Sequence, residues 1–398
     1  MTCIHHLLGL ASVTLLALSG AAGQEAPSLG MERIQLREAW RITEPDVEES
    51  GDLIGLIGHV SEDAEGHILL LDVQLNSVWV YDVQGNPVRS FGRPGEGPGE
   101  LTRPCQIEQL PDGRYAVLES FPGRLVLYEP DGAPAGAITP RLPDAVEATN
   151  TSCARFQVAG DKLAIATLTR SFREGKMVSV HRLGLHGMSG DLESVLATHQ
   201  QEMDPSQKTE MLEEDMTWLG DRWAADSSGT VFAAMGYRGY EVTAFAGAPA
   251  MARTIARPYA SLKRDPGAAR VAELRYSRFS RSAPDITFRI SDAHKDIVSL
   301  AVRRNGELWI QPSDGKWDLD AGVLAEYDAF DTAGTYVRRV QLLGDADPDA
   351  DAVFLLSKHV VVVHDFEGRA RAMVGTVDST ASADQSEEDA VLVTCYGL

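Results

Sequence analysis

Residues 66–72 read Gly-His-Ile-Leu-Leu-Leu-Asp, and residues 80–87 read Val-Tyr-Asp-Val-Gln-Gly-Asn-Pro. The pattern returns 47 residues later without a gap, as Gly-Arg-Tyr-Ala-Val-Leu-Glu at 113–119 and Leu-Tyr-Glu-Pro-Asp-Gly-Ala-Pro at 127–134. Each copy holds two β-rich runs, and the second run ends in an aromatic residue, an acid and, three residues after the acid, a glycine. Glycine readily adopts the positive φ that a tight hairpin requires. The repeat therefore predicts hairpin-connected strands.

Weaker copies of the unit follow along the chain. They begin near Gly160, Gly229 and Gly306, and a last copy covers 358–364. A β-rich run also precedes each copy, which gives four strands, A to D, in units of about 40 to 50 residues. Such units cannot bury both faces alone, so they stack radially as the blades of a β-propeller.

The last unit lacks its fourth strand. Its predicted strands A, B and C cover 352–356, 359–364 and 391–396, where the chain nearly ends. Residues 33–42 alternate apolar and polar side chains ahead of the first complete unit. If this segment pairs beside 391–396, the ring closes and no seam between blades stays open. We therefore predict an all-β, six-bladed β-propeller closed by an N-terminal strand in the last blade.

These motifs carry a family resemblance. Residues 66–72 and 80–87, followed by Ser-Phe-Gly-Arg-Pro-Gly-Glu-Gly-Pro-Gly-Glu at 90–100, resemble the exported bacterial six-bladed propellers related to NHL repeats. Residues 51–138 carry the specific motifs, while the rest is similar in organisation, including Gly-Glu-Leu-Trp-Ile at 306–310. The resemblance implies a propeller and export. It supplies no catalytic residues, because most of that group has no assigned function.

The N-terminus predicts export. An apolar run at 7–18 is followed by small residues at 19–23, which is typical of a cleaved signal peptide covering 1–23. The run is too short for a comfortable transmembrane span, which needs about 20 apolar residues. We expect residues 24–398 to form one propeller domain without a membrane anchor, monomeric, and periplasmic or extracellular.

Composition argues against nucleic acid as a partner, and it does not decide whether the cysteines form a disulfide. Asp and Glu number 58 against 36 Lys and Arg, and the net charge of -22 opposes binding to nucleic acid. Three cysteines follow the signal: Cys105, Cys153 and Cys395. Cys105 and Cys153 could form a disulfide or remain free thiols, and the sequence does not decide between these states.

The unusually long connections should share one side of the propeller. The D-to-A and B-to-C connections emerge on the same side, which we call the D-to-A face, and long loops on a rigid scaffold are usually functional. Two long connections carry helix signals: an acidic one near 204–217, opened by Asp-Pro-Ser-Gln, and a basic one near 258–290, opened by Asp-Pro at 265–266. We hypothesise that they pack together as a partial lid over the channel mouth. The alternative is two independent, solvated helices.

Aligned inner strands suggest polar residues around the channel. The alignment places His59, Gln106, Ala154, Arg222 and Ser299 at equivalent positions. His59, Gln106 and Arg222 are the candidate ligand-binding residues, able to hold a small anionic or hydrogen-bonding molecule. The competing interpretation, which we favour, is that they satisfy backbone groups or channel water.

No cofactor is expected from the sequence. The acidic loop at 345–351 holds four aspartates at alternate positions, which could bind Ca²⁺, although it lacks the glycine and final glutamate of an EF-hand loop. A solvated acidic loop is the preferred interpretation. The eight histidines of the mature chain do not recur at matched inner-strand positions, so no three-histidine zinc centre is predicted.

Two functions remain after these exclusions. The first is a non-catalytic, exported scaffold that binds a protein, peptide or glycan on its D-to-A face. The alternative is a metal-dependent, lactonase-like hydrolase or lyase with its site in the channel and His59 among its ligands. No Gly-x-Ser-x-Gly elbow or His-Glu-x-x-His motif occurs, so we predict no catalytic residues.

Overall fold

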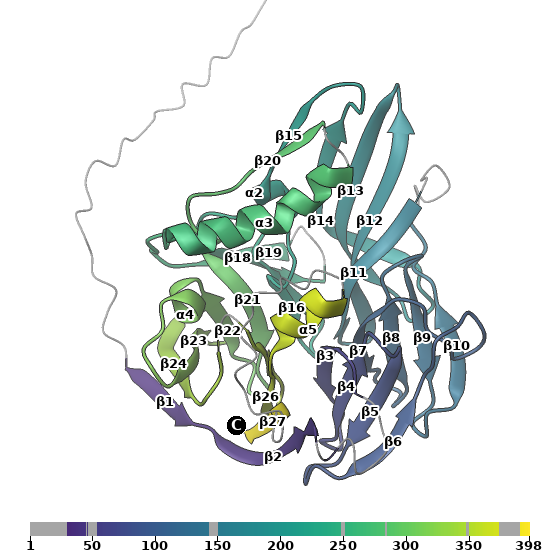
Figure 1. The fold of residues 1–398 in the computed structure, drawn as a ribbon, viewed down its shortest axis with the longest axis vertical. Helices are drawn as coiled ribbons and strands as arrows, with labels where there is room; N and C mark the ends of the chain where they lie inside the picture. The colour runs from purple at the N-terminus through teal and green to yellow at the C-terminus, as the bar shows by residue number, and fades with distance from the viewer. Residues whose placement is uncertain are drawn as a thin grey trace, which may run out of the picture.

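Six sheets of four or five strands follow one another along the chain and surround a common centre (Figure 1). Within each sheet, strands that are consecutive in sequence are neighbours, as in the blades of a propeller. The predicted six-bladed β-propeller is confirmed. The predicted signal peptide, 1–23, lies outside the described residues. The computed structural model describes residues 30–398 except 45, 47–53, 143–149, 248–250, 283–284, 348–349 and 374–390.

The first three blades contain the clearest copies of the repeat. Blades one and two have short strands, whereas the strands of blade three contain ten to twelve residues. From strand A to strand D, blade one contains β3 (Ile57–Glu62), β4 (Ile68–Asp72), β5 (Ser77–Tyr81) and β6 (Pro87–Phe91). Blade two contains β7 (Pro104–Gln109), β8 (Tyr115–Glu119), β9 (Arg124–Tyr128) and β10 (Pro134–Ile138). Blade three contains β11 (Asn150–Ala159), β12 (Lys162–Arg173), β13 (Lys176–His186) and β14 (Leu192–Met203).

The other three blades include the two N-terminal strands. Strand β1 adds a fifth strand to blade five, and strand β2 supplies the fourth strand of blade six. Blade four contains β16 (Trp223–Ala225), β17 (Thr230–Ala233), β18 (Glu241–Ala246) and β19 (Ala252–Ala256). Blade five contains β21 (Ile297–Val302), β22 (Leu308–Pro312), β23 (Val323–Phe330), β24 (Tyr336–Leu343) and β1 (Met31–Gln35). Blade six contains β25 (Ala352–Leu355), β26 (His359–Val363), β27 (Val391–Gly397) and β2 (Arg37–Thr43).

The repeated glycines lie in the turns that join strands. Gly66 and Gly113, between strands A and B, have φ of 93° and 89°. Gly85 and Gly132, between strands C and D, have φ of 85° and 90°. Side chains other than glycine rarely adopt this conformation, which is why the glycines mark the hairpins of the repeat.

Apolar side chains from adjacent blades interlock to form the core. One cluster joins Val361 and Val393 of blade six to Ile57 and Ile68 of blade one. Comparable clusters lie between the other adjacent blades. Because each inner strand is covered on both faces, β4 is buried at all five positions and reads as a continuous apolar run.

The N-terminal chain closes the ring. β2 pairs antiparallel with β27, with Trp40 opposite Cys395 and Ile42 opposite Val393, as predicted. The prediction of one continuous strand over 33–42 is wrong, because β1 instead pairs parallel with β24 of blade five. The chain crosses between the two sheets at Leu36, whose side chain is buried in the core between blades five and six.

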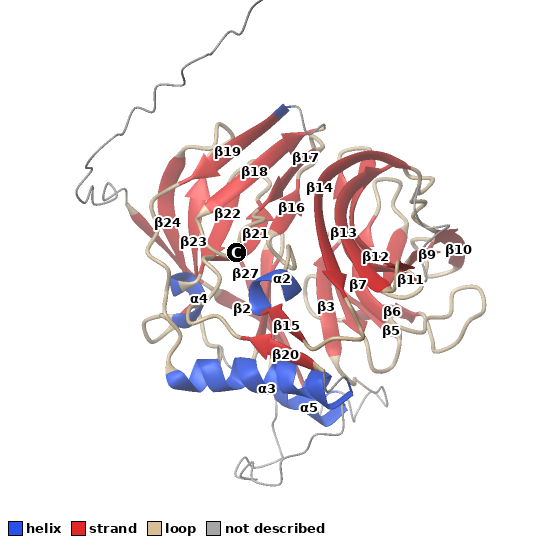
Figure 2. Cartoon of the chain, turned by 90° about the horizontal axis from the view of Figure 1, so that it is seen from above, coloured by secondary structure: helices blue, strands red, loops and turns tan. Residues whose placement is uncertain are grey.

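The long connections share one face. The helices α2 (Glu213–Met216), α3 (Pro266–Ser282), α4 (Asp314–Trp317) and α5 (Phe366–Met373) all belong to D-to-A or B-to-C connections. Figure 1 shows α3 and α5 in front of the sheets, and Figure 2 shows them along the same side. In the described part of the chain, no helix combines the length and the apolar character that a membrane span needs.

The acidic connection is not the helix that its capping signal predicts. Asp204 accepts hydrogen bonds from the backbone N and Oγ of Ser206 and so caps a turn. The chain then forms β15 (Thr209–Leu212), which pairs parallel with β20 (Ile286–Arg289) of the basic connection. Pairing with this distant segment replaces the local helix, and only the four residues of α2 are helical. α3, by contrast, begins at the predicted Asp265-Pro266.

We expect Trp40→Ala to lower the free energy of unfolding by about 3 to 5 kcal/mol, as for other buried aromatic residues. Trp40 is 7% exposed and stacks on Tyr81 of blade one, with the ring centroids 5.7 Å apart. Urea unfolding would measure the change, with Met31→Ala on the exposed part of β1 as the control. A loss below about 1 kcal/mol would contradict the role given to this closing strand.

Candidate functional site

Two of the predicted channel residues tie inner strands of adjacent blades together. His59 on β3 accepts a hydrogen bond through Nδ1 from the backbone N of Ile107, at 3.5 Å. Gln106 on β7 donates to the carbonyl of Phe156 at 2.7 Å and accepts from its backbone N at 3.0 Å. Both side chains thus satisfy backbone groups of the next blade. A ligand-binding role for them remains a prediction.

Arg222 joins two loop segments of the D-to-A face. Its side chain is fully buried, and its guanidinium donates to the carbonyls of Thr217, at 2.9 Å, and Gly236. Burial lowers the pKa of Arg222 to about 10. The three candidates therefore do not form one cluster of hydrogen-bonded side chains, and a ligand-binding role for Arg222 also remains a prediction.

The inner-strand alignment is wrong in blade three. The register shifts between Cys153 and Arg155, as it does between Ile57 and His59 in blade one, so Arg155 rather than Ala154 is equivalent to His59. The error follows from the turn after Ala159, where that residue pairs directly with Lys162. Gly160 therefore lies five residues after Arg155, whereas Gly66 lies seven residues after His59, so the distance from the glycine does not give the register in this blade.

The structure adds charged residues to this inner layer. Glu108 accepts a hydrogen bond from Gln106 at 2.8 Å, and Arg155 donates to the carbonyl of Trp223 at 3.0 Å. Burial raises the pKa of Glu108 to about 7, against the opposing effect of Arg155. Burial and Arg155 lower the pKa of His59 to about 3. Glu108 lies two residues after Gln106, and this alternation was the signal in the sequence that could have identified it.

The two oppositely charged connections pack together. The Glu213 carboxylate accepts hydrogen bonds from both Nη atoms of Arg264, at 2.6 and 2.7 Å, and from the backbone N of Ser291. Arg264 also donates to the hydroxyl of Tyr237, in the B-to-C connection of blade four. The predicted association of the two connections is confirmed. That it covers the channel mouth remains a prediction.

The long strands β13 and β14 of blade three also contact the acidic connection. His181 on β13 lies opposite His199 on β14. Trp218 stacks on His199, with centroids 5.6 Å apart, and contacts His181 edge-on at 6.0 Å. Gln201 donates to the carbonyl of Asp215, just after the start of α2. The acidic connection is thus held by blade three on one side and by the basic connection on the other.

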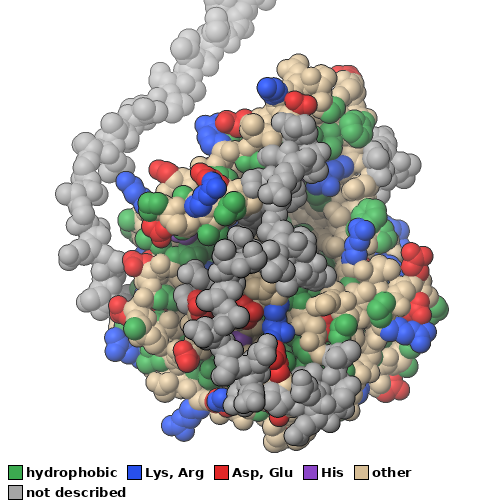
Figure 3. Space-filling model, viewed as in Figure 1, with side chains coloured by type: hydrophobic (Ala, Val, Ile, Leu, Met, Phe, Trp, Pro, Cys, Tyr) green, Lys and Arg blue, Asp and Glu red, His purple; other side chains and the backbone are tan. Residues whose placement is uncertain are grey.

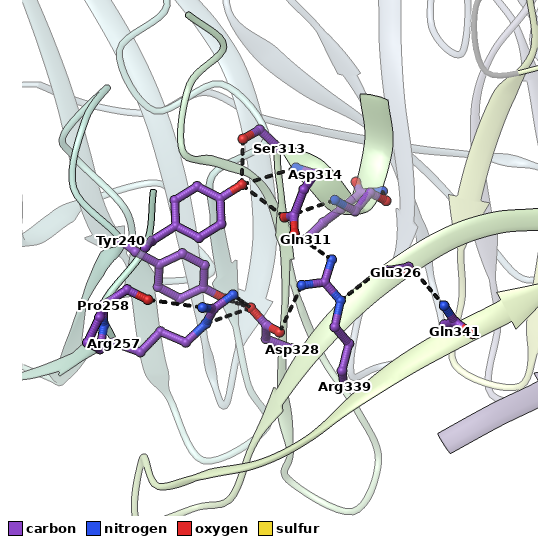
Figure 4. A network of polar contacts seen from close by, with 12 residues as sticks. Tyr240, Arg257, Pro258, Gln311, Ser313, Asp314, Glu326, Asp328, Arg339 and Gln341 are labelled. Atoms are coloured by element: carbon purple, nitrogen blue, oxygen red, sulfur yellow. Dashed lines mark hydrogen bonds and ion pairs between the residues drawn. The ribbon is translucent and has the colours of Figure 1, made fainter. Parts of the chain in front are cut away.

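A buried polar network joins the basic connection to blade five (Figure 4). Asp328 on β23 accepts hydrogen bonds from Tyr240, at 2.6 Å, and from Arg257, at 2.5 and 2.9 Å. Arg339 pairs with Asp314 of α4 at 3.0 Å and lies 3.8 Å from Asp328. The charged groups of this network are paired with one another. The network therefore positions the loops and does not present a free charge.

Three exposed aromatic side chains lie on the D-to-A face, each on a different blade. Among the described residues, the exposed aromatic side chains are Phe121, Phe172 and Trp317. Each lies in or beside a B-to-C connection, of blades two, three and five respectively. The sequence does not reveal them, because the length of a loop does not show which of its side chains point to solvent.

The predicted calcium loop is only partly described. Within it, the Asp351 carboxylate accepts from the backbone N of Asp347 and of Asp365, and lies 3.0 Å from Nδ1 of His364. Positions 348–349, and the acidic segment 378–389, lie outside the described residues. Calcium binding therefore remains a prediction.

One group of described residues has metal-ligand chemistry. Asp63, Glu65 and His67 each offer an atom within 4.8 Å of the others. They lie in the A-to-B turn of blade one, on the side opposite the D-to-A face. Asp63 already accepts hydrogen bonds from Tyr115 and from the backbone N of His67, and these bonds account for its position.

Cys105, Cys153 and Cys395 are free thiols in this structure. Cys105 and Cys153 both belong to the core between blades two and three. Burial raises the pKa of each thiol to about 12, so neither forms a thiolate readily.

Comparisons with known proteins concern the fold alone. No family model and no curated protein matches the sequence. A DUF4221 family member from Bacteroides vulgatus superposes with a TM-score of 0.47 and 9% identity, covering 86% of this chain and 92% of that one. A protein from Bacteroides fragilis named as exported gives 0.45 and 12%, covering 93% and 99%. Virginiamycin B lyase from Staphylococcus aureus gives 0.37 and 9%, covering 78% and 80%.

Replacing Arg264 by alanine should release the acidic connection, because it leaves Glu213 buried without its counter-ion. We expect trypsin to cleave after the exposed Lys208, on the turn before β15, at least about tenfold faster than in the unchanged protein. Arg270→Ala is the matched control, because Arg270 pairs with Glu273 of its own helix. Equal cleavage rates in the two variants would show that the Arg264 pair does not hold the connections together.

Glu108→Gln should change how stability depends on pH. The folded-state pKa is about 7, above the ordinary 4.5, so folding favours the protonated carboxyl. That contribution is present below the unfolded pKa and is lost as the pH rises through about 7. The variant should therefore gain stability over the unchanged protein between about pH 5 and pH 8, measured by urea unfolding. A stability difference between the two proteins that does not change with pH would contradict this assignment.

Proposed function

We propose that this protein is a non-catalytic, exported scaffold that recognises a protein, peptide or glycan through its D-to-A face. The observation that carries the proposal is the placement of its exposed aromatic side chains. Phe121, Phe172 and Trp317 all lie on this one face, among the described residues. Exposed aromatic residues supply much of the energy in recognition sites, because they bury a large surface with few rotatable bonds.

The construction of the face also supports recognition rather than a flexible surface. The buried pair of Glu213 with Arg264 holds the two long connections together. Trp317 stacks on His294, with ring centroids 4.0 Å apart, so its orientation is restricted before any partner arrives. Restricting a contact residue beforehand lowers the entropy cost of binding.

Fewer observations support a metal-dependent hydrolase or lyase in the channel. Such a site needs side chains whose donor atoms are free to hold a cation and substrate. His59 already accepts a backbone hydrogen bond through Nδ1, and Glu108 and Gln106 bond to each other. Export is supported by the apolar run at 7–18 and the small residues that follow it.

Replacing Phe121, Phe172 and Trp317 together by alanine should remove binding while leaving the fold intact, because exposed positions contribute little to stability. We expect retention of envelope proteins, or of glycans on an array, to fall at least about tenfold. The matched control is Val83→Ala with Val88→Ala, which removes exposed apolar side chains near the opposite turns. Unchanged retention by the triple variant, or an equal loss in the control, would contradict the proposal.

A further inference from the structure

The outer strand of blade three is the longest outer edge that the described part of the chain leaves unpaired. β14 contains 12 residues and ends the sheet order β11-β12-β13-β14. The outermost strands of the other blades, β6, β10, β19, β1 and β2, contain only five to seven residues. β24 has eight residues but is not outermost, because β1 pairs with it. The fold thus adds a strand to one long edge and leaves β14 as another.

The half of β14 nearest the D-to-A face is regular enough to pair with a further strand. Residues 197–203 match 177–183 of β13 one to one, and both register shifts of this pair lie before Ala197. The segment contains no proline, lysine or arginine, whereas β6 and β10 begin with proline. Proline, bulges and lysine are common features that keep an edge strand from pairing. Residues 197–203 therefore present a regular row of outward backbone groups.

A row of apolar side chains crosses the sheet to this edge. Phe172 of β12 pairs with Met177 of β13, which pairs with Met203 of β14, so the three side chains lie on one face. Phe172 is 61% exposed, and both methionines are partly exposed. A strand added beside β14 would place its own side chain next to Met203 and continue the row. This position favours an apolar side chain.

We propose that β14 binds an extended peptide as a fifth strand of blade three, with an apolar side chain beside Met203. Main-chain hydrogen bonds to residues 197–203 supply the affinity, and the contact with Met203 supplies selectivity. The net charge of -22 favours a peptide with basic residues and opposes pairing of β14 with a second copy. This inference rests on the proposed recognition function and narrows its ligand to a peptide.

Selection from a phage-displayed library of random nonapeptides tests the proposal. The protein should enrich sequences that alternate apolar and polar residues, and a synthetic peptide of the enriched sequence should slow amide hydrogen exchange within 197–203. Two further peptides carry N-methyl groups on alternate residues, one for each of the two possible sets. Only one set of N–H groups faces β14, so one of these peptides should bind at least about tenfold more weakly than the other.

A substitution at the edge tests the apolar contact. Met203→Ala should weaken the peptide about three- to fivefold, the effect of losing one cross-strand pair. Met251→Ala is the matched control, because Met251 is 67% exposed in the C-to-D connection of blade four. Lack of enrichment, equal binding of both N-methylated peptides, or equal effects of the two substitutions would overturn the proposal. Exchange within 197–203 that slows with protein concentration alone would assign the edge to a second copy instead.

These outcomes also separate the inference from the function on which it rests. If no peptide binds but the triple alanine variant still loses retention of envelope proteins or glycans, the strand-addition site is wrong and the recognition face stands. If no peptide binds and retention does not depend on the aromatic residues, both proposals are wrong.

Discussion

The pairing of β2 with β27 is the constraint on which the rest of the structure depends. A ring of blades buries every inner strand only if the first and last sheets meet, and here the two ends of the chain share one sheet. Contacts across the same seam strengthen the closure. Glu62 of blade one accepts a hydrogen bond from the backbone N of Lys358 at 2.8 Å, and lies 3.5 Å from Nδ1 of His359. Because these contacts join distant segments, opening the seam would expose apolar surface on two blades at once.

Closure also explains why polar side chains near the axis behave as structural residues. Inner strands of neighbouring blades converge without pairing as one sheet, so their backbone groups need side-chain partners. His59 and Gln106 supply them between blades, and Gln157 accepts from the backbone N of Ala225 at 2.7 Å in the same manner. Within blade one, Asp72 accepts from the backbone N of Gly55 at 2.6 Å. Side chains that are free to contact a ligand therefore lie in the connections, where the exposed aromatic residues occur.

The parts of the structure that the sequence could predict are those encoded locally. Turn glycines such as Gly66 and alternating strands are properties of a few adjacent residues, so the repeat and the closing strand were recognisable. β15 was not, because its partner β20 lies more than seventy residues away, and the Asp-Pro signal before it favours a helix. The register at Arg155 was also hidden, since the turn after Ala159 is shorter than the corresponding turn of blade one, where Glu62 pairs with Ile68.

The distribution of charge shows why distant pairing matters for function. The basic connection would attract anions if its arginines were free, but Arg264 pairs with Glu213, Arg289 with Glu210 at 2.8 Å, and Arg257 with Asp328. Figure 3 accordingly shows acidic and basic side chains intermixed around the visible rim of this face. Local charge content therefore says little about the ligand, because the fold neutralises much of it internally.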